Sequence, residues 1–96
     1  MRKVYVVNHS SHNFSDAERF GELVFMSEGR MNRYGTNHII RLFTEALKNS
    51  NKDDLIVLCS LNVMNAIATA IFSHMHGTLN LLLFKDGRYI ERRHIL

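Results

Sequence analysis

The chain of 96 residues has no proline and only one cysteine, and these absences narrow the classes of protein it can belong to. Cys59 cannot form an internal disulfide, and its place at the end of an apolar run predicts a buried thiol. The apolar runs fall well short of the about 18 residues that a membrane-spanning helix needs. Residues 1–3 lead into a short strand rather than into the core of a signal peptide. We therefore expect a soluble protein of the cytoplasm, with no membrane partner.

The sequence also lacks a glycine-rich loop, internal repeats and low-complexity segments. Without that loop, the Walker motif and the dinucleotide fingerprint are excluded in their usual forms. His74 and His76 are two positions apart on a predicted helix, where their side chains do not face each other. No cysteine or carboxylate lies close to them in the sequence. We therefore expect neither a metal site nor a cofactor.

The composition is that of a folded domain. Hydrophobic residues make up 46% of the chain, with six phenylalanines and five methionines. A chain of this length forms one domain, residues 1–96, which buries only about 60 to 65% of the surface of its unfolded form. Self-association as a dimer or higher homo-oligomer is therefore expected. The net charge of +3 mildly favours anionic partners.

Three apolar runs stop abruptly at small polar residues. Residues 4–7 end at Asn8, residues 23–26 end at Ser27, and the run that begins at residue 55 ends at Ser60. Continuous apolar runs are typical of buried parallel strands, and open sheets of this kind bind ligands beyond the carboxyl ends of their strands. The pattern predicts an α/β sheet with one polar edge.

The first connection contains a short helix signal. Ser15 and Glu18 have the spacing of a capping box, which predicts a helix over residues 16–20. Gly21 is expected to end this helix in a left-handed conformation, and residues 22–26 then form the second strand.

Two longer helices follow. Thr36 or Asn37 is expected to cap the first, whose apolar residues recur at three- and four-residue spacing up to residue 47. Ser60 or Asn62 opens the second, which runs to about residue 75 and ends at Gly77. The second helix is apolar on nearly every side, which predicts burial against the sheet and against a second surface, such as another subunit.

The C-terminal region predicts a β-hairpin. Asp86 and Gly87 form a two-residue turn between strands over residues 79–85 and 88–93. The predicted fold is a small Rossmann-like layered α/β domain. It has a mostly parallel sheet of about five strands, two main helices and a C-terminal hairpin.

The turn after the third strand is one candidate binding segment. Ser60, Asn62 and Asn65 place hydroxyl and amide groups where a strand leads into a helix N-terminus. The free N–H groups and the positive dipole end of that helix suit a phosphate or carboxylate. Ordinary helix capping is the alternative explanation for these residues.

The segment after the first strand is a second candidate. Asn8, Ser10 and His12 would lie next to Ser60 and Asn62 if the first and third strands were neighbours. They would then contact the hydroxyls and base edges of a polar ligand. A solvated loop is the alternative, and a catalytic role for His9 or His12 is a further one, because imidazole titrates near neutral pH.

The segment after the second strand combines a carboxylate, two cations and an aromatic ring. A nucleotide could be held there, with Arg30 or Arg33 on phosphate, Tyr34 stacked on a base and Glu28 on ribose hydroxyls, beside Ser27. A charged connecting loop is the simpler alternative.

The final strand carries the densest basic patch of the chain, formed by Arg88, Arg92, Arg93 and His94. Charges of this kind protect an exposed edge strand from unwanted pairing. Binding to nucleic acid is the less favoured alternative, because Tyr89 is the only aromatic residue interleaved with the charges.

Residues 3–10, 22–29 and 79–89 together resemble small proteins encoded by tailed bacteriophages, and the resemblance extends along most of the chain. It includes no motif with an assigned role, so no site residue follows from it. The resemblance implies a context, because phage proteins of this size often neutralise host defences. Some of them sequester or destroy nucleotide immune signals such as cyclic oligonucleotides or cyclic ADP-ribose derivatives.

These observations favour a binding protein, or sponge, for an anionic nucleotide-type small molecule in the host cytoplasm. One alternative is a protein that inhibits a host factor through its dimer surface or its basic hairpin. Another is a small phosphodiesterase or nuclease with His12 as general acid or base and Glu28 as its partner. Whether the chain is an enzyme is left open by the sequence, which favours binding alone.

Overall fold

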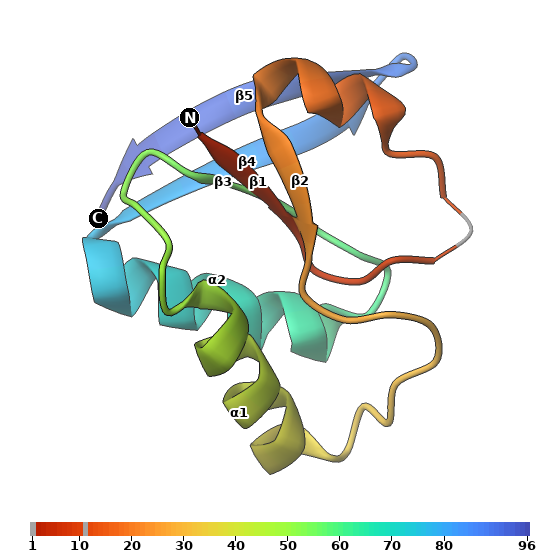
Figure 1. The fold of residues 1–96 in the computed structure, drawn as a ribbon, viewed down its shortest axis with the longest axis vertical. Coiled ribbons are helices and arrows are strands. Elements are labelled where there is room, and N and C mark those ends of the chain that lie inside the picture. Colours follow the sequence, from red (N-terminus) through yellow and green to blue (C-terminus); the bar gives the residue numbers. More distant parts are fainter. Residues whose placement is uncertain (1, 11) are drawn as a thin grey trace.

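A five-stranded sheet in the order β2-β1-β3-β4-β5 forms the centre of the structure (Figure 1). The computed structural model describes residues 2–10 and 12–96. The first four strands run parallel, and the last returns antiparallel to its neighbour. The elements in chain order are β1 (Lys3–Val6), the 3₁₀ helix η1 (Ser15–Phe20), β2 (Glu22–Phe25), α1 (Thr36–Leu47), β3 (Leu55–Val57), α2 (Asn62–His76), β4 (Thr78–Lys85) and β5 (Arg88–Ile95).

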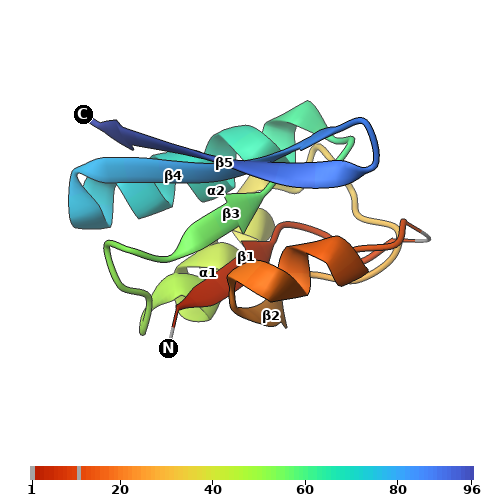
Figure 2. The ribbon, with the colours of Figure 1, turned by 90° about the horizontal axis from the view of Figure 1, so that it is seen from above.

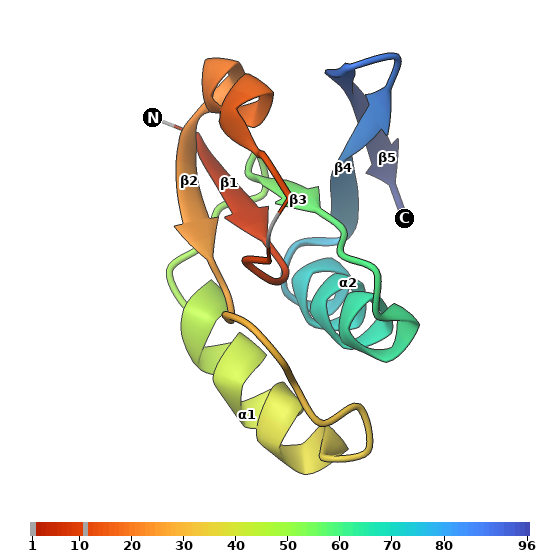
Figure 3. The same ribbon diagram turned by 90° about the vertical axis from the view of Figure 1, so that its right-hand side faces the viewer.

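The two faces of the sheet are covered differently, as Figure 2 and Figure 3 show. Helices α1 and α2 pack against each other on one face, and η1 lies on the other. Tyr5 belongs to the core cluster on the α1–α2 side, whereas Val4 and Val6 belong to the cluster on the η1 side. Both faces of β1 are therefore buried, as its continuous apolar sequence predicts.

The predicted α/β class, mostly parallel sheet and C-terminal hairpin are confirmed. Asp86 and Gly87 have φ values of 52° and 82°, the two positive angles that a type I′ turn requires. Gly77 ends α2 in a left-handed conformation with φ 68°, also as predicted. None of the helices in the described part of the chain has the length and apolar character needed to cross a membrane.

Strand β1 lies between β2 and β3, and this placement decides where the polar loops meet. The chain leaves β1 toward β2 on one side, and it leaves β3 toward β4 on the other side. The carboxyl ends of β1 and β3 therefore lie next to each other at the point where the connections diverge. Open α/β sheets bind their ligands at such a point.

The predicted capping box at Ser15 is wrong. The residue before η1 is Phe14, and no side chain caps the helix. Instead, the Ser15 amide donates to Oδ1 of Asn13 at 2.9 Å, so that Asn13 makes the local turn from outside the helix.

The predicted cap of the first long helix is also wrong, whereas the second begins at Asn62, one of its two predicted starts. Helix α1 starts at Thr36 directly after Gly35, and α2 starts at Asn62 directly after Leu61. Neither helix has a side-chain cap. Polar residues at these positions therefore lie inside the first turn or before it.

Helix α2 is less enclosed than its apolar sequence predicts. Met64, Ala68 and Phe72 are fully buried, but Ile67 is only partly buried and Met75 is 42% exposed. The second covering surface expected for this helix is not provided by the described chain, and self-association stays a prediction.

Gly21 ends η1, but its backbone is extended rather than left-handed, with φ 159° and ψ −174°. The residue is instead required by a close approach of two chain segments. A Cβ at position 21 would lie 2.3 Å from the carbonyl oxygen of Arg2. The same oxygen accepts a hydrogen bond from the Glu22 amide at 3.2 Å. The glycine thus lets the start of β2 pack against the chain that enters β1.

Two side chains of η1 bind the backbone of β5, and we call this contact the η1 clasp. Oδ2 of Asp16 accepts a hydrogen bond from the Tyr89 amide at 2.7 Å, and the Arg19 guanidinium donates to the Tyr89 carbonyl. Arg19 also pairs with Asp16 at 3.3 Å. The clasp holds η1 over the second core cluster, to which Ala17 and Tyr89 both contribute.

We predict that Gly21→Ala lowers the free energy of unfolding by at least about 2 kcal/mol, because the Arg2 carbonyl is backbone and has little room to move away. Urea unfolding measures this loss. Gly77→Ala is the matched control, since its left-handed φ costs about 1 kcal/mol but nothing lies within 4 Å of the new Cβ. Equal losses in the two variants would contradict the role given to the Arg2 contact.

The η1 clasp also predicts a pH dependence of stability. The hydrogen bond from the Tyr89 backbone, helped by Arg19 and Arg88, lowers the pKa of Asp16. A carboxyl whose pKa is lowered by folding stabilises the fold above its usual pKa of about 3.9, and this contribution is lost as the pH falls below that value. Asp16→Asn should therefore lower the melting temperature at neutral pH and make its fall on acidification shallower. Glu18→Gln on the same helix should leave the acid profile unchanged, and a wild-type slope in Asp16→Asn would count against the clasp.

Candidate functional site

A cavity of about 300 Å³ opens beyond the carboxyl ends of β1 and β3. Asn8, Ser10 and His12 line it from the segment after β1, and Cys59 and Ser60 line it from the segment after β3. These segments are far apart in the sequence and meet because β1 pairs with β3. The structure therefore brings four of the candidate residues, Asn8, Ser10, His12 and Ser60, into one cavity.

Aromatic side chains form much of the remaining cavity wall. Phe14 comes from the segment before η1, and Phe84 and Tyr89 come from the hairpin. The His12 ring lies edge-on to Phe14 and to Phe84, with ring centroids 5.0 and 5.4 Å apart. Phe84 is 51% exposed, so part of its ring remains free to contact a ligand. This wall offers a planar molecule both stacking and edge-to-face contacts.

The aromatic cavity carries little charge of its own. Burial raises the pKa of the Cys59 thiol, and burial together with the nearby Asp16 carboxylate raises the pKa of the Tyr89 phenol. Both groups are therefore neutral at neutral pH. The described lining of the aromatic cavity contains no lysine, arginine or carboxylate side chain. The cavity thus suits an uncharged ring that carries hydrogen-bonding groups.

A second cavity, of about 250 Å³, lies at the start of α2. It is lined by Arg33, Ser60, Leu61, Asn62 and Val63. The first N–H groups of a helix have no partner within the helix, and its N-terminus carries a partial positive charge. Arg33 adds a full positive charge from the segment between β2 and α1. Together these groups suit a phosphate or carboxylate.

Ser60 lines both cavities, so they adjoin at the end of β3. The described lining of the aromatic cavity contains no lysine, arginine or carboxylate, and that of the other cavity contains Arg33. A molecule with a planar ring at one end and an anionic group at the other would match this arrangement.

Two of the candidate polar residues, Asn8 and Ser27, form hydrogen bonds within the protein. The Ser27 hydroxyl lies 2.7 Å from the Val7 carbonyl and 2.9 Å from Oδ1 of Asn8. Nδ2 of Asn8 donates to the Gly29 carbonyl at 3.0 Å. Asn8 and Ser27 are both buried, and they tie the ends of β1 and β2 together. Their contribution to the site is to fix the shape of its wall.

Asn65 has a similar structural role. Its Oδ1 accepts a hydrogen bond from the Cys59 amide at 2.9 Å, and its Nδ2 donates to the Cys59 carbonyl at 2.8 Å. Because the Cys59 backbone bonds to this side chain rather than to a neighbouring strand, β3 ends at Val57, two residues earlier than the sequence predicts. Cys59 itself is half-buried rather than fully buried.

Glu28, Arg30 and Tyr34 are exposed and line neither cavity. Oε1 of Glu28 lies 3.6 Å from Nδ1 of His9, whose ring stacks on Phe25 with centroids 4.2 Å apart. Tyr34 is 85% exposed. Of the five residues predicted to bind a nucleotide after β2, the structure thus brings only Arg33 to one of these two cavities, and ligand contacts by the other four stay a prediction.

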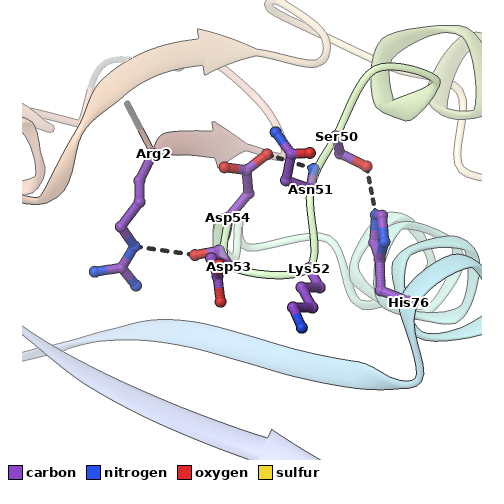
Figure 4. Close-up of a pocket in the computed structure, with 7 residues that line it drawn as sticks. All are labelled: Arg2, Ser50, Asn51, Lys52, Asp53, Asp54 and His76. Atoms are coloured by element: carbon purple, nitrogen blue, oxygen red, sulfur yellow. Dashed lines mark hydrogen bonds between the residues drawn. The ribbon is translucent and has the colours of Figure 1, made fainter.

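The opposite edge of the sheet has a larger, open hollow of about 640 Å³ (Figure 4). Several of its polar groups already bind other groups of the fold. The two Asp54 oxygens accept hydrogen bonds from the Lys3 and Asn51 amides, at 2.9 and 2.8 Å. The Arg2 guanidinium pairs with Glu91 at 2.7 Å. This hollow is therefore a set of structural contacts at the amino ends of the strands. Its lining residues are Arg2, Ser50, Asn51, Lys52, Asp53, Asp54 and His76.

Within residues 2–10 and 12–96, no three histidine, cysteine or acidic side chains are grouped so that they could hold a metal ion. His76 instead packs on Phe72, with ring centroids 4.6 Å apart, and its Nε2 lies 2.8 Å from the Ser50 hydroxyl. These contacts place His76 at the C-terminal end of α2 in a structural role.

Sequence reasoning missed the aromatic wall formed by Phe14, Phe84 and Tyr89. A signal for Phe84 was present, because period-two alternation places it on the same sheet face as the buried Leu82. Which loops face this side of the hairpin depends on the strand order of the sheet. The residues of the hairpin do not specify that order.

Comparisons with curated proteins and with solved structures gave no match. A match was found to a family of phage proteins, and it extends over residues 2–94. This match confirms the resemblance to small phage proteins and covers both cavities. The chain therefore belongs to the family of phage Pam3 gp32-like proteins.

Proposed function

We propose that this protein binds a nucleotide-type small molecule at the carboxyl edge of its sheet. The observation that carries the proposal is the junction of an aromatic cavity and a cationic cavity at Ser60. The junction lies where the connections of β1 and β3 diverge. Rossmann-like domains bind their ligands at this position, and we propose that the domain is of that type.

The planar base of the ligand would occupy the cavity between β1 and β3. Stacking of a base on an aromatic side chain contributes about 1 to 3 kcal/mol. Phe84 offers an exposed ring for this contact, and His12 lies edge-on beside it. Ser10 is exposed at the same cavity and supplies a hydroxyl for the polar edge of the base.

The phosphate would lie at the start of α2. Hydrogen bonds to charged groups are worth about 1.5 to 3 kcal/mol, and Arg33 can donate two of them in parallel. The Ser60 hydroxyl and the Asn62 side chain line the same cavity. Ligand pockets usually measure about 300 to 1,000 Å³, so a nucleotide requires both cavities together. A second copy of the chain would enclose a larger ligand, and we propose that the binding form is a homo-oligomer.

Membership of a phage family suggests where such binding would act, namely in an infected cell. A phage protein that holds a nucleotide without changing it would lower the free concentration of that nucleotide in the infected cell. We propose that it is a sponge for a nucleotide immune signal, such as a cyclic nucleotide or a cyclic ADP-ribose derivative, in the host cytoplasm.

A phosphodiesterase that uses His12 is the second candidate. His12 lies at the aromatic cavity, where it could act as general acid or base. Its expected partner Glu28 pairs with His9 instead, and the described lining of the two cavities contains no carboxylate. The geometry therefore favours binding over cleavage.

A thermal-shift screen against mono-, di- and cyclic nucleotides tests the binding proposal. At a ligand concentration of about 100 times Kd the native state gains about 2.7 kcal/mol. In a domain of this size that gain raises the melting temperature by about ten degrees or more. We expect at least one nucleotide to produce such a shift, and no shift with any member of the panel would reject the proposal.

The double variant Arg33→Ala, Ser60→Ala should lose this shift. Both residues are exposed, so the melting temperature without ligand should change little. Arg41→Ala removes an exposed arginine of α1 that lines neither cavity, and it should keep the full shift. Equal shifts in the wild type and the double variant would show that the ligand binds elsewhere.

Chromatography of the ligand after incubation separates a sponge from an enzyme. We expect the ligand to be recovered intact from the wild-type protein, and from His12→Ala when that variant still binds it. Conversion by the wild type that is lost in His12→Ala would establish the phosphodiesterase instead.

A further inference from the structure

One face of the β4–β5 hairpin is left uncovered by the rest of the chain. The register pairs Leu81 with Arg92 and Leu83 with Ile90, and paired residues point to the same side of a sheet. Leu81 packs against the core cluster on the helix side of the sheet, and Leu83, two residues further on, points to the same side. Both pairs therefore face the helix side. Helix α2 packs on β4, and β5 lies beyond it as the last strand (Figure 3). We call this surface the outer face, and it consists of Leu83, Lys85, Arg88, Ile90, Arg92 and His94.

Lys85 and Arg92 of the outer face form no ion pair with a carboxylate of the described chain, in contrast to the arginines of the opposite face. On the opposite face Arg93 pairs with Asp53 at 2.8 Å, and Arg2 pairs with Glu91 at 2.7 Å. On the outer face the Arg92 guanidinium donates only to the Glu91 backbone carbonyl.

The other basic residues of the outer face differ in their contacts. Arg88 pairs with Asp16 of η1 at 3.9 Å, whereas Lys85 and His94 are exposed and take part in no ion pair with a described residue. Asp53 and Glu91 are thus paired on the opposite face of the hairpin, and Lys85 and Arg92 give the outer face an excess of positive charge.

The centre of the outer face is aliphatic. Leu83 is 41% exposed, and its cross-strand partner Ile90 is partly buried. Cations around an aliphatic centre match a partner that carries both carboxylates and apolar side chains.

The backbone edge of β5 is only partly occupied. The η1 clasp bonds the outward N–H and C=O groups of Tyr89, as a neighbouring strand would. Outward groups recur at every second residue of an antiparallel strand, so those of Glu91 and Arg93 also point away from β4. The clasp does not reach these groups. The Glu91 carbonyl accepts a hydrogen bond from its neighbour Arg92 at 3.0 Å, and the Glu91 N–H and the N–H and C=O of Arg93 leave this part of the edge open to a further strand.

We infer that an extended acidic segment of a partner protein binds along β5 as a sixth strand. Its backbone would bond to the edge at Glu91 and Arg93, and its carboxylates would face Arg92 and His94 on the outer face. Strand addition of this kind takes its affinity from the main chain and its specificity from alternate side chains. This interaction is separate from the proposed nucleotide site, because none of Glu91, Arg92, Arg93 and His94 lines either of its cavities.

The same charges argue against a second copy of the chain as the occupant. Pairing of β5 with another β5 would bring two strands rich in arginine and histidine together, and like charges on adjacent strands are destabilising. The outer face therefore selects an acidic strand.

A fluorescein-labelled peptide of alternating valine and glutamate is the probe for this proposal. Fluorescence anisotropy should show binding at low salt that weakens as salt is added. Arg92→Glu should weaken binding about tenfold or more, as expected when a charge facing the peptide is reversed. Arg41→Glu on α1 makes the same change in net charge at a distant exposed site, and it should leave the affinity within about twofold. Equal weakening in the two variants, or no binding by the wild type, would overturn the proposal.

Amide hydrogen exchange tests the strand addition itself. The peptide should slow exchange at Glu91 and Arg93, because their outward N–H groups become hydrogen-bonded. Binding without this protection would refute strand pairing. Tighter binding to a DNA duplex or to phosphatidylserine vesicles than to the peptide, also lost in Arg92→Glu, would replace the acidic protein segment with nucleic acid or membrane.

Discussion

The parallel pairing of β1 with β3 is the constraint on which both the core and the candidate site depend. Val4, Val6, Leu55 and Val57 are almost completely removed from solvent, so this pair forms the centre of the hydrophobic core. The pairing also aligns the two carboxyl ends. The segments that follow these strands therefore have to share one edge, whatever their own side chains prefer. Polar residues at that edge adjoin a cavity because burial of the apolar strands places them there.

Much of this architecture could be predicted from local sequence, because the apolar runs, the Asp86–Gly87 turn and the stop at Gly77 are local signals. The helix starts could not be predicted. Ser15 has the spacing of a capping residue, but Asn13 makes the turn in its place. A preference for capping residues is a statistical rule about one position, and neighbouring side chains compete for the same backbone N–H groups. The requirement for Gly21 depends on Arg2, which no local pattern links to it.

The site was predictable in part for the same reason. Ser10, His12 and Ser60 could be named from the sequence because strand ends are local features. That they meet depends on the order of β1 and β3, which the sequence leaves open. The aromatic wall depends on more, since Phe14 precedes η1 while Phe84 and Tyr89 come from the hairpin, and the η1 clasp joins these two parts of the chain. Asn65 could be identified from the sequence as a candidate residue, but its structural role could not, because its partner is the backbone of Cys59.

The two sides of the aromatic cavity are far apart in the sequence, and they form in different steps of folding. The β4–β5 hairpin has a two-residue turn and can form within microseconds from local contacts. Pairing of Val4 with Leu55 must instead close a long loop, which makes it a slow and costly step. The cavity needs both, because Phe84 belongs to the hairpin and Asn8 follows β1. Partly folded chains therefore lack the cavity, and a ligand that fits it would bind only the fully assembled sheet.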